Sequence, residues 1–322
     1  MSLDLRPLTL GELLDRSFSL YRRHFWLFVG IMALPSLLGL AFGLLVALFN
    51  PQPGSPGSAA PDVNPAEILG AVLWFAAAMI GMLVVYFITY AVALGATTVA
   101  VSQLYMGRQT SIREAYLPLR GRVGRLALLL VLVSIRLVGI VFLAFMMFGI
   151  AAALGTAGSP LLAGLVGVFG FACAFLLWVW TALRYAVSVP AAVLEDETAS
   201  DAIRRSIELT RGSLLRVFVL LIFTMVITYA VLAVFQGPFL IAGAMAGPDS
   251  STFFWMNLLG TITGSIGGAL TAPLMIVAFA VLYYDLRVRN EGLDLQLMLA
   301  GLEPAGSGHA PTSPALLPGQ GQ

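Results

Sequence analysis

Four carboxylates form the densest group of candidate ligands in the chain: Glu195, Asp196 and Glu197 are consecutive, and Asp201 follows closely. Side-chain oxygens of this kind can hold a divalent cation. Several arginines stand nearby in the sequence, however, and the consecutive carboxylates lie where a loop leads into a helix. The spacing therefore favours a solvated, salt-bridged surface over a metal site.

Other groups with catalytic potential are isolated. His24 stands directly before an apolar run, and His309 lies in a segment rich in Pro, Gly and Ser, so neither has a metal ligand or nucleophile beside it. The single cysteine, Cys173, lies within an apolar run and cannot form an intrachain disulfide. We expect no enzymatic activity, no metal and no cofactor.

Arg136 is the one arginine outside the polar segments, since it lies eleven residues beyond Arg125 in a run of Leu, Val and Ile. That distance is about 16 Å of helix, which would bring Arg136 near the middle of a bilayer. An intramembrane charge indicates function by default. Alternatively, the span begins near Ser134 and the side chain reaches back to the headgroups. No Asp or Glu lies within a span to pair with it, which argues against a transporter coupled through carboxylates.

Small and polar residues follow one face of the last apolar segment. The small ones recur at four-residue intervals, a pattern typical of close helix packing: Gly260, Gly264 and Gly268. The polar ones could hydrogen-bond across helices or line a path for a substrate. Together with Arg136 they form the candidate intramembrane polar site: Asn257, Thr261 and Ser265.

Helices in a membrane must position these residues. Of the 322 residues, 59% are hydrophobic and only 10% are charged, whereas soluble domains have about 25% charged residues. A span needs about 20 largely apolar residues. Six segments qualify: 25–49, 68–100, 126–154, 161–183, 214–235 and 254–284. We expect turns at 50–65, 155–160 and 236–252. The sequence predicts an all-α, polytopic transmembrane helix bundle, and its net charge of +1 gives no reason to expect nucleic-acid binding.

The arginines predict the orientation of these spans. The chain has no lysine, and sixteen of its seventeen arginines lie before the first span, after the second, after the fourth or after the sixth. The other three connections contain none. Because short cytoplasmic loops retain positive charge during insertion, we expect both termini in the cytoplasm. The first apolar run begins only near Phe25, so we expect it to remain as an anchor rather than to be cleaved as a signal peptide.

A segment with one apolar face precedes the first, third and fifth spans. The copies at 9–22 and 198–211 align without gaps and share an acid, an Arg-Ser pair, an apolar residue, a Leu and an Arg, whereas the copy at 110–121 is weaker. Thr9 and Glu12 have the spacing of a capping box. Apolar residues recur at three- and four-residue steps, which is typical of an amphipathic helix in the membrane interface.

We therefore expect a single membrane domain at 1–300, built from three units at about 8–105, 110–183 and 198–285, and a disordered tail at 304–322. Each unit is an interfacial helix followed by a transmembrane hairpin. These helices either only anchor the hairpins or also bind the inner leaflet. The candidate phosphate contacts are Arg16, Arg22, Arg23, Arg120, Arg122, Arg205 and Arg211.

Three stretches resemble a family of bacterial multi-pass proteins. They are PLTLGELLDRSFSLYRRHF at 7–25, PAAVLE at 190–195 followed by RSIELTRG at 205–212, and YYDLR at 283–287. The family is named the membrane domain of glycerophosphoryl diester phosphodiesterases, and the resemblance covers nearly residues 1–300. It implies a bacterial inner-membrane protein. The fused enzymes have a His-Arg-Gly type of site, but here Phe25 follows His24, so the enzymatic part of the name does not carry over.

Two classes of function remain. One is a non-enzymatic membrane module that organises lipids or partner proteins, with anionic headgroups, another membrane protein or a second copy as partners. The other is a channel or transporter for a small or lipid-like solute. The arginine-rich interfacial helices favour the first class, and Arg136 with the polar face of the last span favours the second.

Overall fold

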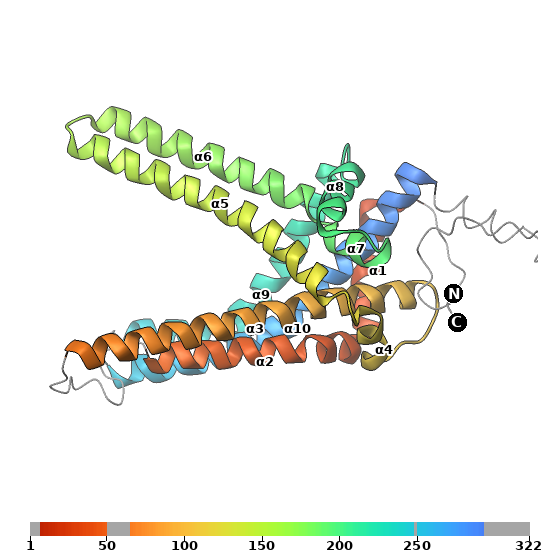
Figure 1. Cartoon of the computed structure of the whole chain (residues 1–322), viewed down its shortest axis with the longest axis horizontal. Helices are drawn as coiled ribbons and strands as arrows, with labels where there is room; N and C mark the ends of the chain where they lie inside the picture. Colours follow the sequence, from red (N-terminus) through yellow and green to blue (C-terminus); the bar gives the residue numbers. More distant parts are fainter. Residues whose placement is uncertain (1–6, 50–64, 248–249, 293–322) are drawn as a thin grey trace, which may run out of the picture. The chain divides into compact units, whose positions relative to one another are not determined.

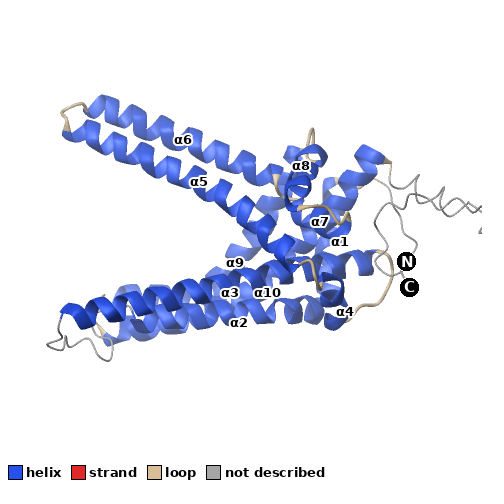
Figure 2. Ribbon diagram, viewed as in Figure 1, coloured by secondary structure: helices blue, strands red, loops and turns tan. Residues whose placement is uncertain are grey.

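The computed structural model describes residues 7–49, 65–247 and 250–292. Every regular element in these residues is helical, and they contain no strand (Figure 2). The all-α prediction is confirmed. The predicted tail at 304–322 and most of the predicted turn at 50–65 lie outside the described residues.

Six helices are long and apolar enough to cross a membrane, which confirms the prediction of six spans and an integral membrane protein. They are α2 (Phe25–Phe49), α3 (Pro65–Tyr105), α5 (Val123–Thr156), α6 (Pro160–Arg184), α9 (Leu214–Ala246) and α10 (Ser251–Glu291). All but α2 extend beyond the expected bounds, by one to eleven residues at an end.

The turn predicted at 236–252 is wrong over most of its length. Helix α9 continues without interruption to Ala246 and contains Pro238. A proline is tolerated inside an apolar helix of this kind, since lipid offers the backbone no alternative hydrogen-bond partner. The left-handed residue of this connection is Gly247, with φ of +81°. The turn predicted at 155–160 is confirmed: α5 ends at Thr156, Gly158 has φ of +81°, and α6 begins at Pro160.

The chain divides into two compact units, which we describe separately. Among the described residues, the first unit holds 7–10, 124–219 and 279–292, and the second holds 11–123 and 220–278. The three sequence repeats stay a prediction.

In the first unit, α5 and α6 lie side by side as a hairpin (Figure 1). Glycines allow the close approach: a Cβ built on Gly170 would lie 2.9 Å from the Cβ of Met147, and one on Gly167 would lie 3.5 Å from the Cβ of Ala151. Two shorter helices follow, α7 (Ser188–Leu194) and α8 (Ala199–Leu209). The end of α10 completes the unit, and its Leu282, Tyr283 and Leu286 are fully buried.

In the second unit, α1 (Leu10–Arg23) buries Leu13, Ser17 and Tyr21 along one face, in keeping with its amphipathic pattern. The membrane part of α10 packs closely on two neighbours. A Cβ on Gly43 of α2 would lie 3.0 Å from the Thr261 methyl, and one on Gly264 would lie 3.0 Å from the Gln236 oxygen of α9. Gly260 faces Phe239 of α9 at 3.4 Å, whereas nothing lies within 4 Å of a Cβ on Gly268.

Side chains cap two of the surface helices. Thr198 accepts a hydrogen bond from the Asp201 amide and so begins α8. The middle surface segment is short, with α4 (Ile112–Tyr116) followed by a 3-10 turn at Leu117–Leu119. It starts from a capping box between Ser111 and Glu114.

Candidate functional site

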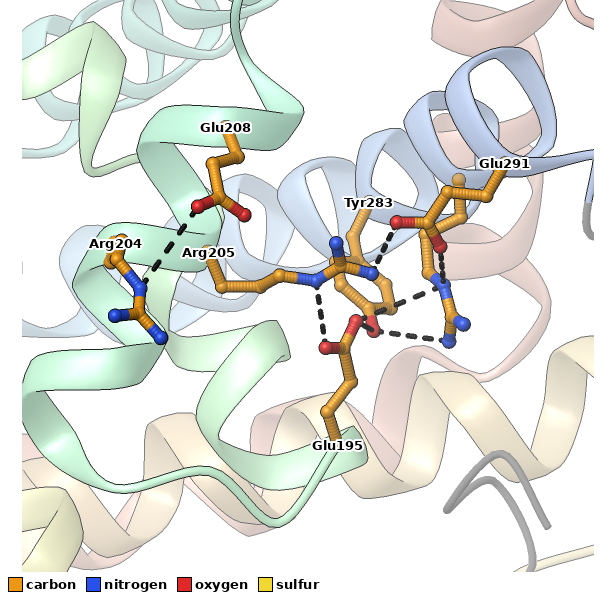
Figure 3. Close-up of polar contacts among 7 residues, drawn as sticks. Glu195, Arg204, Arg205, Glu208, Tyr283 and Glu291 are labelled. Carbon is orange, nitrogen blue, oxygen red and sulfur yellow. Dashed lines mark hydrogen bonds and ion pairs between the residues drawn. The ribbon is translucent and has the colours of Figure 1, made fainter. Parts of the chain in front are cut away.

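A cluster of five polar side chains, the Glu195 network, is the most connected polar site of the first unit (Figure 3). Three of its members come from α10 at four-residue spacing and therefore share one face of that helix: Tyr283, Arg287 and Glu291. Glu195 follows α7, and Arg205 comes from α8. The chain turns sharply between these two helices at Asp196, whose φ is +59°.

The network has a carboxylate on each side of two arginines. Arg205 Nε donates to Glu195 at 2.8 Å, and its other nitrogen pairs with Glu291. Arg287 Nε pairs with Glu291 at 2.9 Å and lies 3.7 Å from Glu195. The Tyr283 hydroxyl donates to Glu195 at 2.6 Å and accepts from Arg287 at 3.4 Å. Each charged group in the network therefore has at least one partner of opposite charge.

The electrostatics of Arg205 follow from these contacts. Burial has the largest single effect on its pKa and lowers it, but hydrogen bonds and charge from Glu195, then from Glu291, outweigh burial and raise the pKa overall. Two arginines balance two carboxylates, so the network carries no excess charge with which to attract an anion or a cation. Such an arrangement fixes helices and offers no reactive group.

Asp285 is the centre of a second polar cluster, on another face of α10, which we call the Asp285 lock. Its side chain is 0% exposed and pairs with Arg216 at 3.3 Å and Arg289 at 3.0 Å. It also accepts the Leu8 backbone N–H at 2.8 Å. Arg216 and Arg289 donate to the Leu8 carbonyl as well. The chain just before α1 is thus tied to α9 and α10 through one carboxylate.

The acidic cluster is engaged in other contacts than metal binding. Glu195 belongs to the network, and Asp196 pairs with Arg125. The Asp201 carboxylate accepts a hydrogen bond from the Thr198 hydroxyl at 2.6 Å and lies 3.3 Å from Arg204. Within the described ranges, no three His, Cys, Asp or Glu side chains converge on a point that suits a metal ion.

The side chains of the predicted polar face of α10 donate their hydrogen bonds within the helix. Asn257, Thr261 and Ser265 each donate to the carbonyl four residues earlier, at 3.1, 2.9 and 2.7 Å. Ser265 and Gly268 also line a pocket of about 280 Å³ in the second unit, between α2, α3 and α10. Two stacked tyrosines from α3, Tyr86 and Tyr90, line it too, with ring centroids 5.9 Å apart. The sequence offered their four-residue spacing as a signal, but we assigned them no role.

Arg136 belongs to the first unit, apart from Asn257, Thr261 and Ser265. Its guanidinium lies over the Tyr185 ring, 5.6 Å from the centroid. Arg136 stands twenty residues before the end of α5 at Thr156, which is about 30 Å of helix, the full thickness of the hydrocarbon. This depth agrees with the interpretation in which Arg136 reaches headgroups at the interface.

The predicted phosphate contacts differ in their surroundings. Arg205 differs from the others, because its guanidinium forms ion pairs with Glu195 and Glu291. Arg16 donates to the Tyr105 hydroxyl at 3.1 Å and lies over that ring. Arg23 is exposed and Arg122 is half-buried. No carboxylate of the described residues pairs with the remaining three, which are exposed: Arg22, Arg120 and Arg211.

Sequence reasoning missed most of the α10 contacts. Tyr283, Asp285 and Arg287 were noted only for a family resemblance, and Glu291 was not singled out. The available signal was their four-residue spacing, which places polar side chains in two rows along a helix. Apart from the contacts within α10, their partners lie more than sixty residues away in the chain, as in the Arg216–Asp285 and Tyr283–Glu195 contacts.

A family model described as "Domain of unknown function (DUF7847)" matches residues 8–286. The chain belongs to this family. Because the matched range ends at residue 286, it includes the members of the Glu195 network up to Tyr283. It also includes the members of the Asp285 lock up to Asp285. Searches of the curated proteins and of the solved structures find no match.

Replacing Glu195 with Gln tests whether the network holds the first unit together. The variant keeps the shape of the side chain but removes the charge that faces Arg205 and Arg287. We expect the free energy of unfolding to fall by about 2–3 kcal/mol, because hydrogen bonds to charged groups are lost and two arginines share one carboxylate. Unfolding in detergent, followed by circular dichroism, measures the change.

Glu208→Gln is the matched control for this variant. The side chains of Glu208 and Arg204 are 59% and 73% exposed and lie 3.9 Å apart. An exposed pair of this kind contributes less than about 1 kcal/mol. Equal losses in the two variants would show that the network has no special role in stability.

Proposed function

We propose that this protein is a non-enzymatic membrane module that binds anionic lipid headgroups through the arginines of its surface helices. We further propose that it resides in a bacterial inner membrane with both termini in the cytoplasm. The observation that carries the proposal is a recurring order along the chain. A surface helix or turn leads to an exposed arginine that pairs with no carboxylate of the described residues, and a membrane span follows at once.

The first instance lies at the end of α1. Arg22 is exposed, and α2 begins at Phe25. The Trp26 side chain beside it is 81% exposed. Tryptophan prefers the level of the headgroups, where an arginine meets lipid phosphate. Arg22 is therefore in a position suited to contact a headgroup.

The same order recurs in the other two segments. Arg211 follows α8, Gly212 turns the chain with φ of +82°, and α9 begins at Leu214. Leu215 in the first turn of α9 is 71% exposed, as expected of a residue that faces lipid. Arg120 follows the 3-10 turn, three residues before α5 begins. Each arginine thus precedes an apolar helix by only a few residues.

The polar interior supports a structural role over a catalytic one. The Glu195 network and the Asp285 lock use their charges on each other. The resemblance to the membrane domain of glycerophosphoryl diester phosphodiesterases, without the motif of the catalytic part, agrees with a module of this kind. The proposal therefore assigns the protein no reaction.

Replacing Arg211 with Gln tests the lipid preference. We expect spin-labelled phosphatidylglycerol to be immobilised at the surface of the wild-type protein more than spin-labelled phosphatidylcholine. In the variant this preference should fall, since one arginine near an anionic surface contributes about 1 kcal/mol. Electron paramagnetic resonance of the protein in mixed vesicles measures both lipids.

Arg204→Gln is the matched control, because Arg204 is also exposed on α8 but lies beside Asp201 and Glu208. It should leave the preference unchanged. A wild-type protein that does not discriminate between the two lipids would refute the proposed function.

The proposed orientation has its own test. A green fluorescent protein fused after Gln322 folds and fluoresces only in the cytoplasm, whereas an alkaline phosphatase fused there is active only in the periplasm. We expect fluorescence and no phosphatase activity, because sixteen arginines accompany the ends that would lie inside. The opposite pair of results would contradict the orientation.

The pocket of the second unit favours a second candidate function, the passage of a small polar solute. Its lining offers hydroxyl groups from Ser36, Tyr86, Tyr90 and Ser265 in a span region. If this function is correct, liposomes that contain the protein release small polyols faster than empty ones. Gly268→Phe should then slow the release, since its side chain would enter open space. Equal release from protein-containing and empty liposomes would exclude this candidate.

A further inference from the structure

The hairpin of α5 and α6 carries an apolar groove of about 380 Å³ on its surface. Large hydrophobic side chains line it and remain exposed, among them Phe145 at 72% and Phe171 at 57%. In a membrane span, such a surface faces lipid. Side chains from both helices line the groove, so it offers more than a flat annular contact.

The lining follows one face of each helix. On α5 the lining residues Ile140, Ala144 and Phe148 are spaced four residues apart. Arg136 lies four residues before Ile140 and continues this row toward the interface. On α6 the lining ends at Trp178, and Tyr185 lies seven residues, or two turns, further on. One end of the groove is therefore bordered by Arg136 and Tyr185.

These two side chains meet directly, with the Arg136 guanidinium 5.6 Å from the centre of the Tyr185 ring. No described carboxylate pairs with Arg136, whose side chain is exposed. It lies about 30 Å of helix from the tip of the hairpin, at the depth of headgroups when the tip reaches the opposite surface. An unpaired cation at that depth is complementary to a lipid phosphate.

We infer that the groove binds one anionic phospholipid, with its phosphate on Arg136 and an acyl chain along Ile140, Ala144 and Phe148. The apolar part of the site extends along α5 from Ile140 to Phe148, a rise of about 12 Å. It suits a hydrocarbon chain, and its interfacial end suits a phosphate. This site goes beyond the proposed function, because it is a single lipid position on the hairpin and uses none of the surface-helix arginines.

Native mass spectrometry of the delipidated protein, titrated with dioleoyl phosphatidylglycerol, tests the inference. We expect one lipid to bind more tightly than the rest. Arg136→Gln should weaken this first binding by about tenfold, because it removes the charge that pairs with the phosphate. Ala144→Trp should weaken it similarly by filling the groove.

Two matched controls separate this site from other effects. Ala172 is exposed on α6 and does not line the groove, so Ala172→Trp should leave the first binding unchanged. Arg211→Gln should also leave it unchanged, while it lowers the general anionic preference. The two proposals can therefore fail independently.

Three outcomes would overturn the inference. In the first, no phosphatidylglycerol molecule binds more tightly than the others. In the second, Arg136→Gln, whose exposed position makes it compatible with folding, binds as the wild type does. In the third, Ala144→Trp converts a dimer into a monomer without affecting lipid, which would show that the groove receives a second copy of the chain.

Discussion

The need to keep charge out of hydrocarbon determines much of this structure. A charged side chain in the middle of a bilayer is costly, so the chain gathers its arginines at one end of the six spans. There they meet two different surroundings. Some find carboxylates and become part of the protein interior, as Arg205, Arg287 and Arg216 do. Others find none and face outward, as Arg22, Arg120 and Arg211 do. The first group stabilises the fold, and the second is available to a ligand.

Helix α10 shows how the paired group works. Its final turns are buried, although Tyr283, Asp285 and Arg287 are polar. Burial of such groups is tolerable only when each finds a partner. Four-residue spacing divides them into two rows, one facing Glu195 and Arg205 and the other facing Arg216 and the Leu8 backbone. One helix thereby anchors both the α7–α8 segment and the chain just before α1. Loss of one carboxylate would leave arginines buried without compensation, which is why the network is a sensitive point of the fold.

The sequence predicted the spans well because hydrophobic length alone determines them. It failed at 236–252, where Pro238 and the neighbouring glycine suggested a turn, but the lipid environment kept the backbone helical. The surface helices could also be predicted, since caps and apolar periodicity are local features of the sequence. The contacts of the candidate site were much harder to predict from the sequence. Arg205 carries the same sequence signals as Arg211, and its ion pairs with Glu195 and the distant Glu291 distinguish it from an exposed arginine. Long-range pairing of this kind leaves no pattern in a single sequence.

The near balance of seventeen arginines and sixteen acids hides a separation along the membrane normal. By sequence, Asp62 and Asp249 belong to two of the predicted connections that contain no arginine. In the predicted topology, about 30 Å of hydrocarbon separates those connections from the arginines, which is too far for an ion pair. Arginines at the other end therefore exceed the carboxylates within reach. Lipid phosphate is the anion always present at that depth, and it can supply the missing charge. In the proposed lipid site, Arg136 stands at the headgroup end of the α5–α6 groove, where a phospholipid offers a phosphate to its charge and an acyl chain to its apolar neighbours.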